Sequence, residues 1–284
     1  MPNSDLAGSI LGEKFQMLEQ EDRSSKYGQF WRAKKIADDS LVSVRLLKPE
    51  LFRDPHATVR FERETRVLRK FRHPNLLQVV SHGRTDEGLA YLVTEYREGR
   101  SLGDEIGELP VETVCHIAMQ IAAVLAAAHS QGIVHRGLEP DAILLCENGA
   151  DPNHVKVLDF GLAHMTTDSG EAQVTLAGQR IGKAEYLAPE YIRDQQLDAR
   201  SDVYVLGILT FEMLIGQPPF VGPMAKVLRK HLDDTPWTPS ELCEEEVPEW
   251  LDTLVLACLA KSPADRPQTG LQVARAFAYR QFPM

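Results

Sequence analysis

The chain has 284 residues, of which 41 are acidic and 31 are basic, so its formal net charge is -10. Hydrophobic residues make up 43% of the sequence and charged residues 25%, which is ordinary for a folded globular protein and excludes disordered and fibrous classes. Because the acidic excess repels phosphate backbones, we expect no nucleic-acid partner.

Two apolar stretches, residues 116–134 and 203–216, invite a membrane interpretation. The first contains Gln120 and His129, and the second is short and contains Glu212, so neither reaches the about 20 mainly apolar residues that span a bilayer. The N-terminus also lacks a basic stretch followed by an apolar run, which is the pattern of a secretory signal. We therefore expect a cytoplasmic protein without a membrane segment.

The first third of the chain predicts short strands and one helix. Apolar alternation indicates strands over residues 15–20, 27–34, 41–47, 76–81 and 90–96. A helix is expected over 55–71, where Val59, Leu68 and Phe71 are interpreted as one apolar face. The TDEG sequence at 85–88 favours a hairpin turn between the last two strands.

From residue 99 onwards the pattern is mainly helical. Helices are expected over residues 111–130, 198–216, 250–260 and 269–280. The Gly-Gln-Pro-Pro sequence at 216–219 ends the second of these helices sharply. The outline is a small strand-rich lobe joined to a larger helical lobe.

An ordered set of short motifs runs through the chain. In chain order they are VSVR (42–45), HPN (73–75), HRGLEPDAILL (135–145), VKVLDFG (155–161), YLAPE (186–190), SDVYVLG (201–207) and DRP (265–267). This series resembles the motifs of eukaryotic-type protein kinases, in particular the bacterial serine/threonine kinases. The resemblance implies an α+β, bilobal protein-kinase-like fold in a single domain over 1–284. An antiparallel β-sheet N-lobe with helix C would lie at about 12–96, and a mainly α-helical C-lobe at about 97–282.

The resemblance implies that the framework residues of such a domain are present. Glu64 matches the glutamate of helix C, and Asp202 matches the aspartate that holds the catalytic loop by hydrogen bonds. Glu190 and Arg266 match the two residues whose ion pair anchors the activation segment. We expect all four residues to stabilise the fold.

The residues to which the resemblance assigns chemistry are replaced. Phosphoryl transfer needs a positioned hydroxyl, metal ions and neutralisation of the charge on the γ-phosphate. The aspartate that accepts the substrate proton is Gly137 here, and the lysine that contacts the γ-phosphate is Glu139. The asparagine that binds the second metal ion is Ala142. We therefore predict that none of these three catalytic positions is intact.

The energetic cost of these three replacements favours a loss of catalytic activity. A positioned general base contributes typically about 10²–10⁴-fold, and a misplaced negative charge costs about 4 kcal/mol at about 4 Å and an effective dielectric constant of about 20. The sequence therefore predicts a pseudokinase rather than an enzyme, a signalling scaffold or allosteric regulator that binds protein partners such as kinases or other signalling components. The alternative is a divergent ATP-dependent serine/threonine protein kinase with low or unconventional activity, with Glu139 or Asp141 supplying the carboxylate.

The nucleotide site implied by the resemblance is also altered. Arg45 replaces the strand lysine that contacts the phosphates, and Gly28 is the last glycine of a phosphate loop whose first two glycines are absent. Phe30 replaces a small valine at the adenine, and it either fills the adenine slot or turns outward. With Glu64, and with Asp159 as the candidate metal ligand, Gly28 and Arg45 are the candidate cofactor-binding residues. No cofactor is expected, and weak binding of ATP and Mg²⁺ is left open.

Overall fold

The computed structural model describes residues 6–25, 28–47, 55–107, 109–158, 160, 184–193 and 197–282, and gives the backbone alone at 22–25, 55–58, 60, 63 and 64. The described residues divide into two compact units. Unit 1 contains those within 1–72 and 77–98, and unit 2 contains those within 73–76, 99–160 and 184–282.

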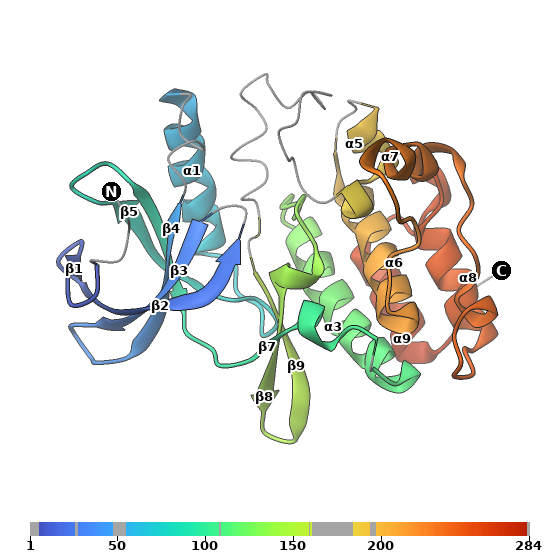
Figure 1. Ribbon diagram of the computed structural model, residues 1–284, viewed down its shortest axis with the longest axis horizontal. Coiled ribbons are helices and arrows are strands. Elements are labelled where there is room, and N and C mark those ends of the chain that lie inside the picture. Colours follow the sequence, from blue (N-terminus) through green and yellow to red (C-terminus); the bar gives the residue numbers. More distant parts are fainter. Residues whose placement is uncertain are drawn as a thin grey trace. The chain divides into compact units, whose positions relative to one another are not determined.

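Unit 1 is built on a six-stranded antiparallel sheet with the strand order β1-β2-β3-β4-β6-β5 (Figure 1). The strands are β1 (Ile10–Leu11), β2 (Phe15–Ser25), β3 (Gly28–Lys35), β4 (Leu41–Leu47), β5 (Val79–Arg84) and β6 (Ala90–Glu95). The helix α1 (Pro55–Leu68) follows β4 in the sequence. The predicted antiparallel strands are therefore present, with ends shifted by a few residues.

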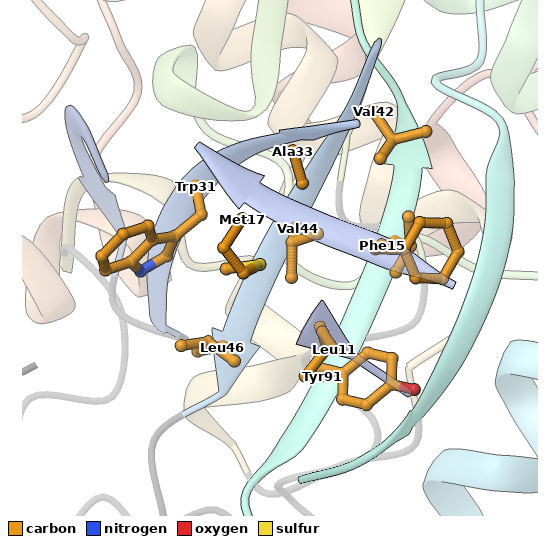
Figure 2. Close-up of a cluster of buried hydrophobic side chains, with 10 residues drawn as sticks. Leu11, Phe15, Met17, Trp31, Ala33, Val42, Val44, Leu46 and Tyr91 are labelled. Carbon is orange, nitrogen blue, oxygen red and sulfur yellow. The ribbon is translucent and has the colours of Figure 1, made fainter. Parts of the chain in front are cut away.

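One face of this sheet carries the apolar core of unit 1. Figure 2 shows the side chains that meet there, which come from the first four strands and β6. They are Leu11, Phe15, Met17, Trp31, Ala33, Val42, Val44, Leu46, Tyr91 and Val93, all of them buried. Because successive side chains of a strand point to opposite faces, Phe30 on β3 and Arg45 on β4 lie on the other face of the sheet. That second face is important for the functional site.

The buried side of α1 differs from the predicted one. Phe61 and Leu68 are 2% and 5% exposed, whereas Val59 is 65% exposed. Residues 61 and 68 are seven positions apart, two turns of a helix, and therefore share a face. Val59 and Leu68 are nine positions apart, which places them on opposite sides, so the predicted face was wrong at Val59.

The hairpin between β5 and β6 confirms the predicted turn. The Thr85 amide donates to the Leu89 carbonyl oxygen (2.8 Å) and the Gly88 amide to the Thr85 carbonyl oxygen (2.9 Å). Gly88 has a φ of 83°, which a residue with a side chain rarely adopts. The strand β5 begins at Val79 rather than at 76, because Leu76 instead forms a parallel bridge with Val157 in unit 2.

Unit 2 is mainly helical, with one three-stranded antiparallel sheet of order β7-β8-β9. Its strands are β7 (Arg100–Ser101), β8 (Ile143–Asn148) and β9 (Asp151–Val157). Its α-helices are α2 (Leu102–Glu105), α3 (Val111–His129), α5 (Pro189–Ile192), α6 (Ala199–Ile215), α7 (Met224–Asp233), α8 (Glu249–Cys258) and α9 (Gly270–Tyr279). Its short 3₁₀ turns are η2 (Pro140–Ala142), η3 (Ala184–Tyr186), η4 (Pro239–Glu241) and η5 (Pro263–Asp265).

The helix α3 forms the centre of unit 2, in contact with α6, α9 and β9 (Figure 1). It is the one described helix that is long and apolar enough to cross a membrane, and 56% of its apolar window is buried inside the protein. Residues such as Ile117, Ile121 and Leu125 are completely buried. This burial is typical of a core helix.

The helix α6 shows how the sequence sets its own ends. Asp198 accepts the Arg200 amide at 2.8 Å, and the Ser201 hydroxyl accepts the Asp198 amide at 3.3 Å, so both ends of a capping box are formed. Gly216 ends the helix with a φ of 83°, which confirms the predicted sharp stop. These two ends fix the position of Asp202, in the first turn of α6.

Residues 73–76 are bound into unit 2 by hydrogen bonds. The Asn75 side-chain amide donates to Gln120 Oε1 on α3 (2.8 Å) and to the Val155 carbonyl oxygen on β9 (3.0 Å). The Val157 amide donates to the Asn75 carbonyl oxygen at 2.8 Å. Asn75 and Gln120 are both buried, so these bonds form out of contact with water.

Candidate functional site

The HRGLEP loop is held by Asp202. The backbone amides of His135 and Arg136 donate to the two Asp202 carboxylate oxygens at 2.8 and 2.9 Å, and His129 Nε2 lies 2.8 Å from Asp202 Oδ2. Asp202 is only 1% exposed, so charge-assisted hydrogen bonds replace its hydration. Arg136 has a φ of 62°, a strained conformation for arginine that these bonds support. The predicted role of Asp202 is confirmed, and the contribution of His129 was missed.

The His135 ring joins this loop to the residue that precedes Asp159. His135 Nε2 donates to the Leu158 carbonyl oxygen at 2.7 Å, and His135 Nδ1 accepts the Gly137 amide at 3.3 Å. These two bonds require a neutral ring protonated at Nε2. The ring also packs against Phe160, with ring centroids 4.5 Å apart. The loop geometry is therefore determined by side chains that surround Gly137.

The three replaced positions lie within this supported loop. Gly137 contributes its backbone amide, as described above, and has no side chain for a proton. Glu139 precedes the η2 turn, and its carbonyl oxygen accepts the Ala142 amide at 2.9 Å. Ala142 is 3% exposed and presents only a methyl group. The assignment of these positions to catalysis stays a prediction from the resemblance.

Two carboxylates follow Gly137 in different surroundings. The Glu139 side chain is partly buried and is close enough to Tyr186 for its charge to contribute to the raised pKa of that phenol, whose main cause is burial. The Asp141 side chain is exposed, and its Oδ1 is 3.4 Å from the Ser101 hydroxyl. The two carboxylates of the loop therefore differ in exposure and in their neighbours.

A pair formed by a partly buried tyrosine and a buried glutamate lies beside the loop, and sequence reasoning missed it. The Tyr186 hydroxyl is 2.9 and 2.8 Å from the two carboxylate oxygens of Glu212 on α6. Glu212 is 7% exposed, and burial together with its charge raises the Tyr186 pKa well above the ordinary value. The sequence did contain a sign of this pair: Glu212 is a carboxylate within a helix that is otherwise apolar on all sides, so it needs a buried partner.

The predicted ion pair between Glu190 and Arg266 is confirmed. Both guanidinium NH groups donate to the carboxylate, each at 2.8 Å, and the Ser201 hydroxyl donates to Glu190 Oε1 at 2.6 Å. Burial alone would raise the Glu190 pKa, but the bonds from Arg266 and Ser201 hold it below the ordinary value of 4.5. Arg266 also donates to the carbonyl oxygens of Ala260 and Arg200. This fully bonded pair anchors α5 against α6.

In unit 1 the candidate nucleotide residues share one face of β3 and β4. Phe30 and Arg45 are directly opposite each other across the two strands, and Ser43 is two positions before Arg45 on the same side. The guanidinium carbon of Arg45 lies 4.0 Å from the centroid of the Phe30 ring. Phe30 is 5% exposed, so its ring does not turn outward but stacks on Arg45.

Gly28 has a packing reason of its own. A Cβ at this position would collide with the Leu46 carbonyl oxygen of the neighbouring strand β4. The glycine is therefore required by the close approach of two backbones, which does not by itself indicate a phosphate. Its role in cofactor binding stays a prediction.

Two candidate site residues cannot be placed by their side chains. Asp159 and the side chain of Glu64 lie outside the described residues, so their predicted roles in cofactor and metal binding stay predictions. Mg²⁺ prefers oxygen ligands, and Ala142 supplies none. Among the described residues no three histidine, cysteine or acidic side chains are grouped to hold a metal ion.

The described face of β3 and β4 does fit a polar, anionic molecule such as ATP. Arg45 brings a positive charge, and the Ser43 hydroxyl is buried without a hydrogen-bond partner among the described residues. A buried polar atom left in this way is uncommon in folded proteins and fits a ligand that supplies the bond.

A six-stranded antiparallel sheet with one helix, a mainly helical second unit and an aspartate-held HRGLEP loop together define a protein-kinase-like molecule. The family model "Protein kinase domain" matches residues 24–277, and the chain belongs to this family. The predicted family and the predicted fold class are both confirmed.

Named relatives support the same assignment. The chain is 34% identical to the serine/threonine-protein kinase pkn3 of Myxococcus xanthus over 84% of its own length and 45% of the relative. It is 38% identical to the serine/threonine-protein kinase PknB of Mycolicibacterium smegmatis over 82% of its own length and 37% of the relative. The chain thus spans less than half the length of these curated relatives.

Solved structures agree on the fold. The crystal structure of the Mycobacterium tuberculosis PknI kinase domain superposes with a TM-score of 0.74 and 23% identity, and covers 97% of this chain and 99% of that one. At this level of identity the likeness shows the fold alone.

The comparisons contradict the prediction of an inactive pseudokinase that is not an enzyme. The relatives that match most of this chain are named as serine/threonine protein kinases, which favours the alternative interpretation. The replacements at Gly137, Glu139 and Ala142 were interpreted as a loss of activity, although they show only that the side chains of the loop have changed. The cofactor prediction agrees in part, because the family uses ATP and Mg²⁺, whose weak binding the sequence left open.

Proposed function

We propose that this chain is the catalytic domain of an ATP-dependent serine/threonine protein kinase with low or unconventional activity. The observation that carries the proposal is the 34–38% identity, over more than four fifths of the chain, to relatives named as serine/threonine protein kinases. The kinase domain extends over 1–284, with its lobes at about 12–96 and 97–282. It acts in the cytoplasm on protein substrates and signalling partners.

The catalytic-loop framework supports this proposal. Asp202 fixes the backbone of His135 and Arg136, and the neutral His135 ring fixes Leu158 and Gly137. Preorganised groups of this kind account for much of the rate of phosphoryl transfer, which depends mainly on positioning and electrostatics. The loop retains that order although its catalytic side chains differ.

The proton of the substrate hydroxyl needs an acceptor other than residue 137. In the proposed reaction the hydroxyl oxygen bonds to the γ-phosphorus, the bond from that phosphorus to the ADP oxygen breaks, and the proton moves to a carboxylate oxygen. Glu139 and Asp141 are the carboxylates nearest in the loop. A carboxylate two or four residues away from position 137 accepts the proton less efficiently than one placed directly beside the hydroxyl, which agrees with low activity.

Phosphate transfer to the protein itself and to myelin basic protein tests the proposal. The reaction would contain millimolar ATP with Mg²⁺ or Mn²⁺, and mass spectrometry would locate phosphoserine and phosphothreonine. Asp159→Asn is the negative control. Transfer above that control supports a kinase, and transfer equal to that control would reject it.

The acceptor is identified by a matched pair of variants, Glu139→Gln and Asp141→Asn. Each substitution replaces a carboxylate by an amide of the same size, so the loop keeps its shape. The variant that loses transfer identifies the acceptor, and a loss in neither variant would exclude both carboxylates from the role.

A further inference from the structure

We propose that the Phe30 side chain is a built-in competitor of ATP, held on the polar face of β3 and β4 by its stack on Arg45. The inference rests on the proposed function, because it takes ATP as the ligand of this face. It makes Phe30 the residue that determines how strongly the domain binds the nucleotide.

The stack is set by strand register. Phe30 and Arg45 are Cα partners in the β3–β4 pair, so their side chains leave the sheet side by side. The guanidinium carbon lies 4.0 Å from the ring centroid, and the two residues are 5% and 4% exposed. A cation–π contact removed from water in this way is stronger than one at an exposed surface.

The face that carries the stack is unlike the opposite face of the sheet. The side chains on the opposite face are apolar and form the core in Figure 2. On this face, Ser43 and Arg45 are polar residues that are 6% and 4% exposed, and the Ser43 hydroxyl has no hydrogen-bond partner among the described residues. An apolar ring therefore covers a surface whose neighbouring groups suit a polar ligand.

A nucleotide that reaches Arg45 along this face meets the Phe30 ring. The ring must first change its rotamer, which breaks the stack with the guanidinium. When only a fraction of molecules is open in this way, the apparent affinity falls by that fraction. Shortening the side chain removes the competition for this face.

Calorimetric titration with a non-hydrolysable ATP analogue and Mg²⁺ tests this proposal. We expect Phe30→Val to lower the dissociation constant about tenfold or more, since tenfold corresponds to about 1.4 kcal/mol, which is in the range of a shielded cation–π contact. The matched control is Phe15→Leu, which alters a buried phenylalanine on the opposite face of the same sheet. It should leave the dissociation constant within about threefold of the original.

A second variant, Phe30→Leu, retains most of the buried volume and is used if valine prevents folding, as judged by circular dichroism. Equal or weaker binding by the Phe30 variants, or no binding by any variant, would overturn the proposal. The same gain in Phe15→Leu would overturn it as well, because the effect would then follow general loosening of unit 1.

The titration separates this proposal from the proposed function. A Phe30→Val protein that binds the analogue more tightly but transfers no phosphate supports the competitor and rejects the kinase. An original chain that transfers phosphate, together with a Phe30→Val variant that gains no affinity, rejects the competitor alone.

Discussion

Gly83 on β5 stands directly opposite Tyr91 on β6, and the tyrosine ring lies over the glycine so closely that a Cβ at Gly83 would be 2.5 Å from the Tyr91 hydroxyl oxygen. Tyr91 is 6% exposed, and burial raises the pKa of its phenol. The ring belongs to the core cluster of unit 1. Glycine is therefore required at position 83, because the Tyr91 ring occupies the space that a side chain would need.

We expect Gly83→Ala to lower the free energy of unfolding by about 1–3 kcal/mol, the usual cost of overfilling a packed core. Urea denaturation followed by circular dichroism measures the change. In a Tyr91→Leu background the ring is gone, and the same glycine substitution should cost much less. An equal cost in both backgrounds would show that the ring does not set the requirement for glycine.

The buried pair of Glu190 and Arg266 predicts a strong asymmetry between single and double variants. Arg266→Met leaves the Glu190 carboxylate buried without a cation, and we expect a loss of about 3–5 kcal/mol of stability. The double variant Glu190→Leu/Arg266→Met removes both charges and should be more stable than Arg266→Met. Denaturant titration of the three proteins decides, and a double variant less stable than Arg266→Met would contradict the prediction.

The stability of the domain should fall between pH 6.5 and pH 4 because of His231. Burial, with a smaller contribution from the charge of Lys261, lowers the His231 pKa from 6.5 to about 4, and the Tyr204 hydroxyl lies 2.8 Å from His231 Nδ1. The unfolded chain takes up a proton below pH 6.5, whereas the folded chain does so only near pH 4. The loss over this window reaches about 3 kcal/mol.

Denaturant titrations at pH 7.5, 6.0 and 5.0 check this prediction against His231→Phe, which should show a flatter profile. Glu190 does not interfere with the comparison. Its folded pKa is below 4.5, so its contribution is complete above pH 4.5 and is lost only under more acidic conditions. Identical slopes for the two proteins would show that His231 takes up its proton equally in the folded and unfolded states.

Restoring an aspartate at residue 137 should raise the rate of phosphate transfer. A positioned general base contributes typically about 10²–10⁴-fold, and the Asp202 and His135 bonds already hold the backbone at this position. We expect Gly137→Asp to gain at least about 10²-fold in single-turnover transfer, and the uncharged, same-sized Gly137→Asn to gain little. A similar gain from both variants would assign the effect to the shape of the loop.

The order of the motifs was enough to predict the family, the antiparallel sheet and the apolar helices α3 and α6. The buried residues of α3 recur at helical spacing, whereas α6 is a continuous apolar run that is too long for a strand, and both patterns can be recognised in a sequence. The helix α7 was missed although its buried residues, Val227 and His231, lie one helical turn apart. The helix has 10 residues, so only about three turns were available to show the pattern.

Contacts between distant segments account for the other errors. The start of β5 depends on Leu76, which pairs with Val157 on β9, and no local pattern records such a partner. The direction of the Phe30 ring depends on Arg45 across the strand pair and could only be left open. The prediction of inactivity failed for a different reason: three replaced residues indicate which groups have changed, but they do not measure a rate.

The bonds of Asn75 to Gln120 and Val155 mean that the helical unit is assembled from non-contiguous stretches of chain. A fragment beginning at Gly99 would lack Asn75, which donates a hydrogen bond to the side-chain oxygen of the buried Gln120 on α3. Expression of the second half alone should therefore give a poorly soluble product. Supplying residues 73–76 within a longer fragment, or co-expressing the first half, restores the missing partner, so the boundary drawn by sequence order is the wrong place to cut this protein.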